Sequence, residues 1–134
     1  MIVWGQELAH LEFAERLLKV KFIPAESSWL ASVDANGSLL GVVVYTRFSK
    51  YNCEMSVAAA SPRFLSKKSL KSFFGYPFLQ LGLRRVTAVT EETNHHAQAF
   101  LLRLGFTPEG ILRDWFETTD GIILGMLKGE CKWL

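Results

Sequence analysis

The sequence predicts a mixed α/β fold (α+β) built on one central, mostly antiparallel sheet, and three observations support this prediction. Strand-like and helix-like segments follow one another as strand, helix, three strands, helix, strand, helix and two strands. Three strands in a row favour an antiparallel meander, and a strand between two helices favours a crossover connection. A chain of 134 residues, 49% of them hydrophobic, has the size and apolar content of one domain. We therefore expect residues 1–134 to form a single domain.

The first half of the chain supplies a helix and a meander. Apolar residues recur at helical spacing in residues 6–19, and Pro24 follows this helix. The apolar segments on either side of Asn36-Gly37 predict two strands joined by a tight type I′ turn, in which both central residues take positive φ. Residues 52–60 predict the next strand, which Ser61-Pro62 ends.

The second half supplies two helices and three strands. Residues 66–81 have helical spacing, and Gly75 and Pro77 mark where this helix kinks or breaks. The stretch "RRVTAVT" alternates as a strand. Residues 94–104 predict a helix that ends at Gly105, and the C-terminal segment predicts a hairpin around Asp120-Gly121.

Composition excludes several classes of protein. A net charge of +2 is small for a nonspecific nucleic-acid binder, so such a partner is not expected. Cys53 and Cys131 lack the spacing of a metal site, which predicts reduced thiols and no bound metal. The N-terminal residues lack a signal-peptide pattern, and no apolar stretch reaches the roughly 18 residues of a membrane span. We expect a cytoplasmic protein without a membrane partner.

The segment "NHHAQAFLLRLGFTPEGILRDWF", residues 94–116, resembles a late segment of the GNAT superfamily of acyl-CoA-dependent N-acetyltransferases. In that segment an Asn opens a helix that ends in Leu-Gly-Phe. Glu109-Gly110 and Arg113 look most like the branch that acetylates ribosomal-protein N-termini. The stretches "SVAAASPRFLSKKSLKSFFGYPFLQLGLRRVTA" and "GMLKGECKWL" are similar to GNAT-like proteins of tailed bacteriophages, which would place the chain in a host cytoplasm. The resemblance covers nearly the whole chain and is most specific from about Gly37 onward.

This resemblance implies a fold, a co-substrate and a reaction. The fourth and fifth strands of the sheet would splay into a V that holds acetyl-CoA. Pantetheine would pair with the fourth strand, here residues 54–60, and the pyrophosphate would lie at the N-terminus of the following helix. The reaction would move an acetyl group to a primary amine of a protein N-terminus, a lysine or a small molecule, by direct attack.

The residues around this strand and helix fit the implied site with one departure. Small side chains in "SVAAAS" would let an amide chain pair with the strand, although alanines packed beneath a helix give the same pattern. The family pattern places glycines where Ser66 and Lys68 stand, because bare backbone N–H groups must face the pyrophosphate. A helix start still attracts an anion, but Ser66 as an N-cap with solvated lysines explains the same residues. Asn94 would face the pantetheine arm or cap its helix. The predicted cofactor contacts are Val57, Ala58, Ala59, Arg63, Phe64, Leu65, Ser66, Lys67, Lys68, Ser69 and Asn94.

Glu54 is the predicted general base, because an amine must lose a proton before it attacks a thioester. Ser56 lies two residues later on the same face and is the weaker catalytic candidate. An exposed strand glutamate is the alternative reading of Glu54. Leu101 stands where the resemblance places the tyrosine acid of many family members, so the general-acid role is either absent or met by solvent. A backbone N–H near Val57 or Ala58 would meet the oxyanion.

Acceptor and partner are left open by the sequence. Trp4, Trp29, Phe48, Tyr51, Trp115 and Phe116 are candidate acceptor walls or ordinary core. Arg84 and Arg85 could join Lys67, Lys68 and Lys71 in a basic rim. The alternative function is a GNAT fold that has lost catalysis and binds a partner protein or nucleic acid; a nucleobase acceptor is a third possibility. The sequence does not predict an oligomeric state.

Overall fold

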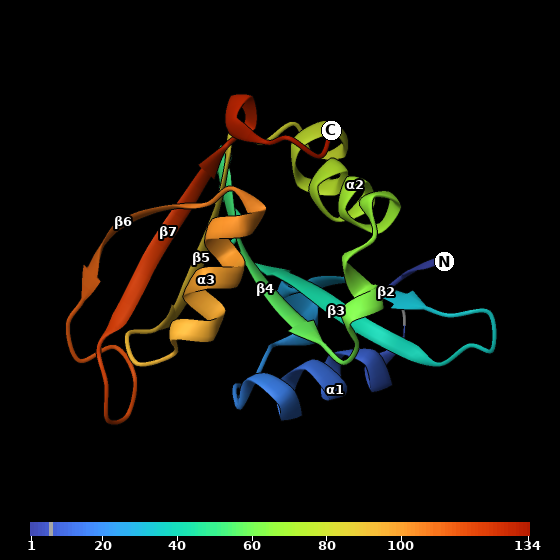
Figure 1. The fold of residues 1–134 in the computed structure, drawn as a ribbon, viewed down its shortest axis with the longest axis horizontal. Coiled ribbons are helices and arrows are strands. Elements are labelled where there is room, and N and C mark those ends of the chain that lie inside the picture. Colours follow the sequence, from blue (N-terminus) through green and yellow to red (C-terminus); the bar gives the residue numbers. More distant parts are fainter. Residues whose placement is uncertain (6) are drawn as a thin grey trace.

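The computed structural model describes residues 1–5 and 7–134, with the side chains of Pro62 and Leu65 also outside the description. Gln6, where the predicted first helix begins, therefore lies outside the described residues. One seven-stranded sheet has helices on both faces (Figure 1). Its strands are β1 (Ile2–Trp4), β2 (Ser28–Val33), β3 (Leu39–Thr46), β4 (Asn52–Ala59), β5 (Arg85–Glu91), β6 (Thr107–Leu112) and β7 (Gly121–Leu127). The helices are α1 (Leu8–Leu18), α2 (Lys67–Gly75) and α3 (His95–Leu104), with short helical turns η1 (Pro24–Glu26), η2 (Pro62–Leu65), η3 (Tyr76–Gln80) and η4 (Lys128–Glu130).

The strands are ordered β1-β2-β3-β4-β5-β7-β6, and the β4–β5 pair is parallel while the other neighbouring pairs are antiparallel. This order confirms the predicted mixed, mostly antiparallel sheet. The single parallel pair arises because α2 and η3 carry the chain back from the end of β4 to the start of β5.

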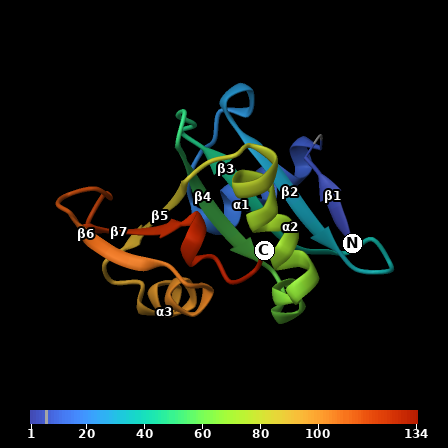
Figure 2. The same ribbon diagram turned by 90° about the horizontal axis from the view of Figure 1, so that it is seen from above.

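The helices divide between the two faces of the sheet, and each face has its own core. Leu11 and Ala14 of α1 pack with β2, β3 and β4 residues that share one face, such as Val42 and Ala58. Side chains from α2 and α3 pack on the opposite face, including Phe74. Figure 2 shows α2 and α3 on the same side of the sheet. Alternate residues of β4 therefore belong to different cores.

β4 and β5 separate after a short paired region. Their register pairs Asn52 with Arg85, Cys53 with Val86 and Glu54 with Thr87. β4 then runs on to Ala59 and β5 to Glu91 without further pairing between them, and the two strands diverge in Figure 1. The predicted V is confirmed, and Glu54 lies at its vertex.

The predicted helix of residues 66–81 breaks in the way Pro77 favours. The α-helix ends at Gly75, and the chain continues as one π-helical turn, with Leu81 N donating to Tyr76 O at 3.0 Å. Pro77 has no N–H for the carbonyl of Phe73, four residues earlier. The buried hydroxyl of Tyr45 donates to that carbonyl instead, at 2.6 Å. The strand below thus satisfies a carbonyl that the helix cannot.

Both predicted hairpins form, but the β2–β3 connection is not the predicted tight type I′ turn. In the β2–β3 loop Asn36 does not take positive φ, whereas Gly37 does, at 79°. The Asp34 carboxylate accepts from the N–H groups of Asn36 and Ser38, which stabilises a wider loop. The β6–β7 loop spans residues 113–120, and Gly121 already lies in β7. The type I′ turn was therefore a wrong prediction, whereas the predicted C-terminal hairpin is confirmed, with Asp120-Gly121 where its loop meets β7.

Helix α3 begins and ends as predicted. Asn94 Oδ1 accepts from Ala97 N at 3.0 Å, which is an N-cap bond. Gly105 takes positive φ, 113°, and lets Phe106 N donate back to Leu101 O. His95 and His96 are exposed in the first turn.

Candidate functional site

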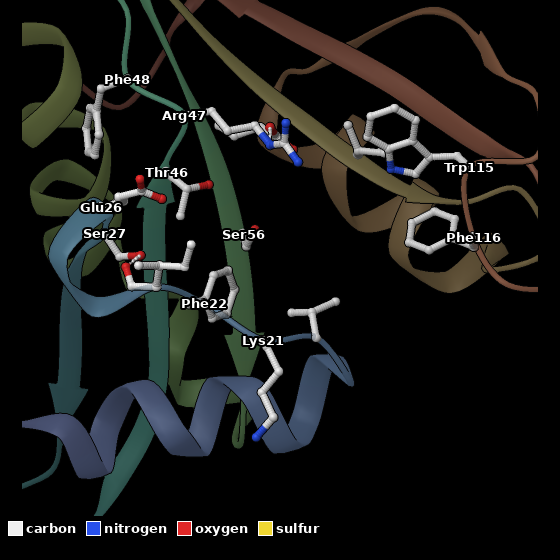
Figure 3. A pocket seen from close by; sticks show the side chains of 14 residues that line it. Lys21, Phe22, Glu26, Ser27, Thr46, Arg47, Phe48, Ser56, Trp115 and Phe116 are labelled. Carbon is white, nitrogen blue, oxygen red and sulfur yellow. Dashed lines mark hydrogen bonds and ion pairs between the residues drawn. The ribbon is translucent and has the colours of Figure 1, made fainter.

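A cavity with a volume of about 860 Å³ lies on the α1 face of the sheet, at the vertex of the V. Five segments line it: the chain after α1, the end of β3 with the residues that follow it, β4, β5 through Val89, and the β6–β7 loop (Figure 3). Two predicted catalytic residues, Glu54 and Ser56, are among the lining residues. They share this face because they are two residues apart in a strand. The splayed strands thus bring a carboxylate and a hydroxyl to the floor of a cavity.

Glu54 pairs with Arg47, a residue that the sequence analysis missed. Arg47 Nε lies 2.8 Å from Glu54 Oε2. The Glu54 side chain is 22% exposed, while that of Arg47 is 70% exposed. Burial raises the pKa of the Glu54 carboxyl above its ordinary value, and the positive charge of Arg47 opposes this shift. A carboxyl with a raised pKa is a stronger base than an ordinary glutamate, which suits proton transfer near neutral pH.

The register shows which backbone groups of β4 face the V. Tyr51 O accepts from Arg85 N on the β5 side, whereas Ala60 N donates to Leu40 O on the β3 side. Successive residues of a strand direct their backbone groups to alternate sides, so residues 55, 57 and 59 face β5. Beyond Glu54 that side is not paired with β5. Of the predicted backbone contacts, Val57 and Ala59 therefore face the opening.

Ala58 is placed differently. Its backbone lies opposite Val42 of β3, and its side chain is buried against α1. The alternative explanation for the alanines, packing beneath a helix, thus applies to Ala58, while Ala59 and Ala60 are exposed. Of the two backbone N–H groups that were candidates to meet an oxyanion, only that of Val57 faces the opening.

The start of α2 follows the far end of β4 and is tied to the sheet. Phe64 of η2 is buried against Gly41 of β3 and packs on Phe73, with ring centroids 4.9 Å apart. The Phe64 side chain is therefore core, and only its backbone remains available to a ligand. Arg63 Nη2 lies 3.3 Å from Asp34 Oδ2 in the β2–β3 loop. The side chain of Leu65 lies outside the described residues.

The predicted N-cap of α2 is present. Ser66 Oγ accepts from Ser69 N at 3.1 Å and donates to Ser69 Oγ at 2.9 Å. Leu70 N makes the first regular helical bond, to Ser66 O. The backbone N–H groups of Lys67 and Lys68 belong to the first turn, where helical geometry provides no internal acceptor. These N–H groups and the exposed lysines give the helix start its attraction for an anion.

Asn94 follows the end of β5 and is the N-cap of α3, which lies on the same side of the sheet as α2 (Figure 2). Its Oδ1 is used in the cap of α3, so its amide NH₂ is the group that remains for a ligand. Leu101, which the resemblance places where many GNAT enzymes carry a tyrosine, is buried against the sheet. It is an apolar core residue.

Three of the six predicted aromatic walls line the cavity. Phe48, Trp115 and Phe116 do so. Trp29 is buried beneath α1, and Trp4 packs edge-on to Tyr76. Tyr51 carries the Arg84 guanidinium 3.8 Å above its ring centre. Phe22, which the sequence analysis did not single out, completes the lining.

The predicted basic rim does not form. Arg84 and Arg85 lie beside Tyr51 at the start of β4, whereas Lys67 and Lys68 follow its far end. Arg85 instead makes two bonds to the Glu109 carboxylate, at 2.6 and 2.9 Å. This pair raises the pKa of Arg85 and lowers that of Glu109 through their hydrogen bonds. The rim prediction was wrong because the length of α2 and η3 separates the two groups.

Within the described part of the chain, no three His, Cys, Asp or Glu side chains gather as metal ligands. Cys53 is buried and Cys131 half-buried, and both are free thiols. None of the described helices has the length and apolar character needed to cross a membrane.

The sequence matches no protein-family model and no curated protein, but the fold matches solved acetyltransferases. The F149A mutant of spermidine N-acetyltransferase SpeG from Vibrio cholerae superposes with a TM-score of 0.77 and 16% identity, over 100% of this chain and 97% of that one. The manganese complex of spermidine/spermine N-acetyltransferase SpeG from Vibrio cholerae superposes with a TM-score of 0.74 and 17% identity, over 95% of this chain and 91% of that one. A dodecameric spermidine N-acetyltransferase from the same organism superposes with a TM-score of 0.75 and 16% identity, over 96% of this chain and 94% of that one. The chain has the GNAT acyltransferase fold; at this identity the likeness extends to the fold alone.

Proposed function

We propose that the protein is an N-acetyltransferase that moves an acetyl group from acetyl-CoA to a primary amine. The observation that carries this proposal is the position of Glu54. A half-buried carboxylate with a raised pKa lies at the vertex of the V, on the floor of a cavity and beside the unpaired edge of β4. The edge offers hydrogen bonds to an amide chain, the cavity offers room for an amine, and Glu54 stands between them.

The residues present fit an acyl-CoA although the protein lacks a glycine-rich loop at the start of α2. The backbone groups of Val57 and Ala59 would bind the pantetheine amides. The first-turn N–H groups of α2, with Lys67 and Lys68, would hold the pyrophosphate. The hydroxyl of Ser66 accepts a hydrogen bond from only one of the N–H groups at that helix start, the N–H of Ser69. Acetyl-CoA would supply an activated thioester carbon to the amine.

In the proposed reaction the amine nitrogen bonds to the thioester carbon and the carbon–sulfur bond breaks. Glu54, directly or through a water, takes the proton that the amine releases. The Val57 N–H stabilises the charge that develops on the carbonyl oxygen. The CoA thiolate takes a proton from solvent, since Leu101 stands at the tyrosine position. Ser56 helps to orient the amine or its water.

The acceptor is a protein N-terminus, a lysine or a small amine. The resemblance to the ribosomal-protein branch and to phage proteins remains a prediction, as does a cytoplasmic location.

Titration calorimetry with acetyl-CoA and CoA, followed by a CoA-release assay with an amine panel, tests the proposal. We expect binding at micromolar to millimolar concentrations and a Glu54→Gln variant that binds normally but turns over at least about 100-fold more slowly. Undiminished turnover in the variant from pH 6 to 9 would remove Glu54 from the mechanism. Absence of binding at millimolar CoA would favour the alternative, a GNAT fold that binds a partner macromolecule.

A further inference from the structure

Large apolar side chains exposed to solvent gather around the mouth of the cavity. Val20, Ile23, Phe48 and Trp115 all line it, and each is between 38% and 60% exposed. They come from three segments that are far apart in the sequence. Apolar side chains scattered over a surface need no explanation, but a group at one cavity marks a surface that binds apolar groups.

Two further aromatic side chains continue this apolar lining inward. Phe22 and Phe116 are half-buried. In Figure 3 Phe22 lies near Ser56 on the floor, and Phe116 lies beside Trp115 on the β6–β7 side of the opening. The cavity that contains Glu54 thus has aromatic side chains on its floor and on its β6–β7 side.

The charges that line the cavity nearly balance. They are Glu26, Glu54, Arg47 and Lys21. Lys21 also lines a second hollow with Glu12, Glu15 and Arg16 of α1, and in Figure 3 its ammonium points away from the other labelled side chains. Arg47 is paired with Glu54. Two carboxylates and one guanidinium leave a single net negative charge in the cavity.

We propose that the acceptor is an amine with one positive charge carried on an apolar body, such as an arylalkyl amine or the N-terminus of an apolar residue. This inference rests on the proposed function and specifies its substrate class. A linear polyamine would bring several ammonium groups against aromatic walls, where each needs its own carboxylate to offset lost hydration. The cavity has the charge for one ammonium and the apolar surface for the rest of the molecule.

An acceptor panel tests this inference. The measurement is kcat/KM for 2-phenylethylamine, methylamine, spermidine and a tetrapeptide with N-terminal Phe, at saturating acetyl-CoA. We expect 2-phenylethylamine or the peptide to exceed both methylamine and spermidine by at least about tenfold. If 2-phenylethylamine reacts faster, the acceptor is a small free amine; if the peptide reacts faster, the acceptor is a polypeptide N-terminus. Spermidine equal to or faster than both would overturn the inference and leave the proposed function intact.

The Trp115→Ala variant distinguishes loss of the apolar wall from a general loss of activity. Trp115→Ala should lower kcat/KM for 2-phenylethylamine about tenfold and for methylamine less than twofold. Leu102→Ala removes another exposed apolar side chain, on α3 and away from the cavity, and should change neither. An equal loss for both amines in Trp115→Ala would contradict a role in binding the apolar body.

Binding measurements keep the inference testable without turnover. If CoA binds but no amine is acetylated, the proposed function fails. Calorimetric titration of 2-phenylethylamine and spermidine into the CoA complex then decides the inference alone. Tighter binding of 2-phenylethylamine, weakened by Trp115→Ala, supports it; equal or absent binding overturns it.

Discussion

Arg47 holds Glu54 across the β3–β4 connection, with Nε 2.8 Å from Oε2, and does so from a left-handed backbone conformation, φ 51°. That conformation is uncommon for a residue with a side chain and is found more often at functional sites. It turns the chain immediately after β3 and directs the guanidinium toward the cavity in Figure 3. The ion pair therefore opposes the effect of burial on the proposed base.

Arg47→Gln should move the acid limb of the pH profile of kcat/KM to higher pH. The reason is that Arg47 lowers the pKa of Glu54, which burial raises, so removal of the charge leaves the burial effect unopposed. Arg47→Lys retains the charge and should shift the limb less. A shift to lower pH would show that Arg47 does not act on the proposed base.

Glu54→Gln should leave the thermal unfolding temperature at pH 7 unchanged or slightly higher. A carboxyl whose pKa is raised in the folded state binds its proton more tightly there than in the unfolded chain. Glu54 therefore weakens the fold as pH rises through that pKa, and a neutral side chain avoids this loss. A large fall in unfolding temperature would assign a structural role to Glu54.

The double variant Lys67→Glu, Lys68→Glu should weaken CoA binding at least about tenfold, measured by calorimetry at fixed salt. Negative charge in the first turn repels a pyrophosphate while it favours the helix dipole, so the fold should remain intact. Arg113→Ala, in the exposed β6–β7 loop, is the matched control. Equal effects of the two variants would contradict the placement of the pyrophosphate.

Gly41→Ala should lower the free energy of unfolding by about 1–3 kcal/mol. A Cβ on Gly41 would overlap the buried Phe64 ring, which fixes η2 and the start of α2. Gly75→Ala is the control, because a Cβ there meets no atom within 4 Å and the backbone is helical. It should be neutral or stabilise by about 0.5–1 kcal/mol in urea unfolding. Equal stabilities of the two variants would contradict the packing of Phe64.

Tyr45→Phe should cost about 1–3 kcal/mol of unfolding free energy, because it leaves the buried carbonyl of Phe73 without a donor. In a Pro77→Ala background residue 77 regains an N–H, and the cost of Tyr45→Phe should fall. A double-mutant cycle measures this coupling. Strict additivity would show that Tyr45 does not compensate for the proline.

Local signals in the sequence predicted much of this fold. Ser66, Asn94 and Gly105 cap their helices as expected, since each acts on backbone groups a few residues away. The tight turn at Asn36-Gly37 failed because the Asp34 carboxylate stabilises a longer loop. The sequence contained that carboxylate, but its effect depends on the geometry of the whole loop.

The site could be predicted only where strand periodicity decides it. Glu54 and Ser56 share a face in any strand, but which face carries the cavity depends on α1. The choice of Val57 over Ala58 requires the β3–β4 register. The pair of Arg47 and Glu54 had one usable signal, their positions on either side of a short β-hairpin connection. The separation of Arg84 from Lys67 is set by how α2 and η3 cross the sheet, which spacing alone does not reveal.

The unpaired stretch of β4 is also a strand edge, and such edges recruit strands from other proteins and lead to aggregation. Here the edge lies inside the V, facing β5, between the layer of α1 and the layer of α2 and α3 (Figure 1). A foreign strand would need to enter between two strands that already meet at Glu54. Its position inside the V thus hinders self-association of the protein through this edge.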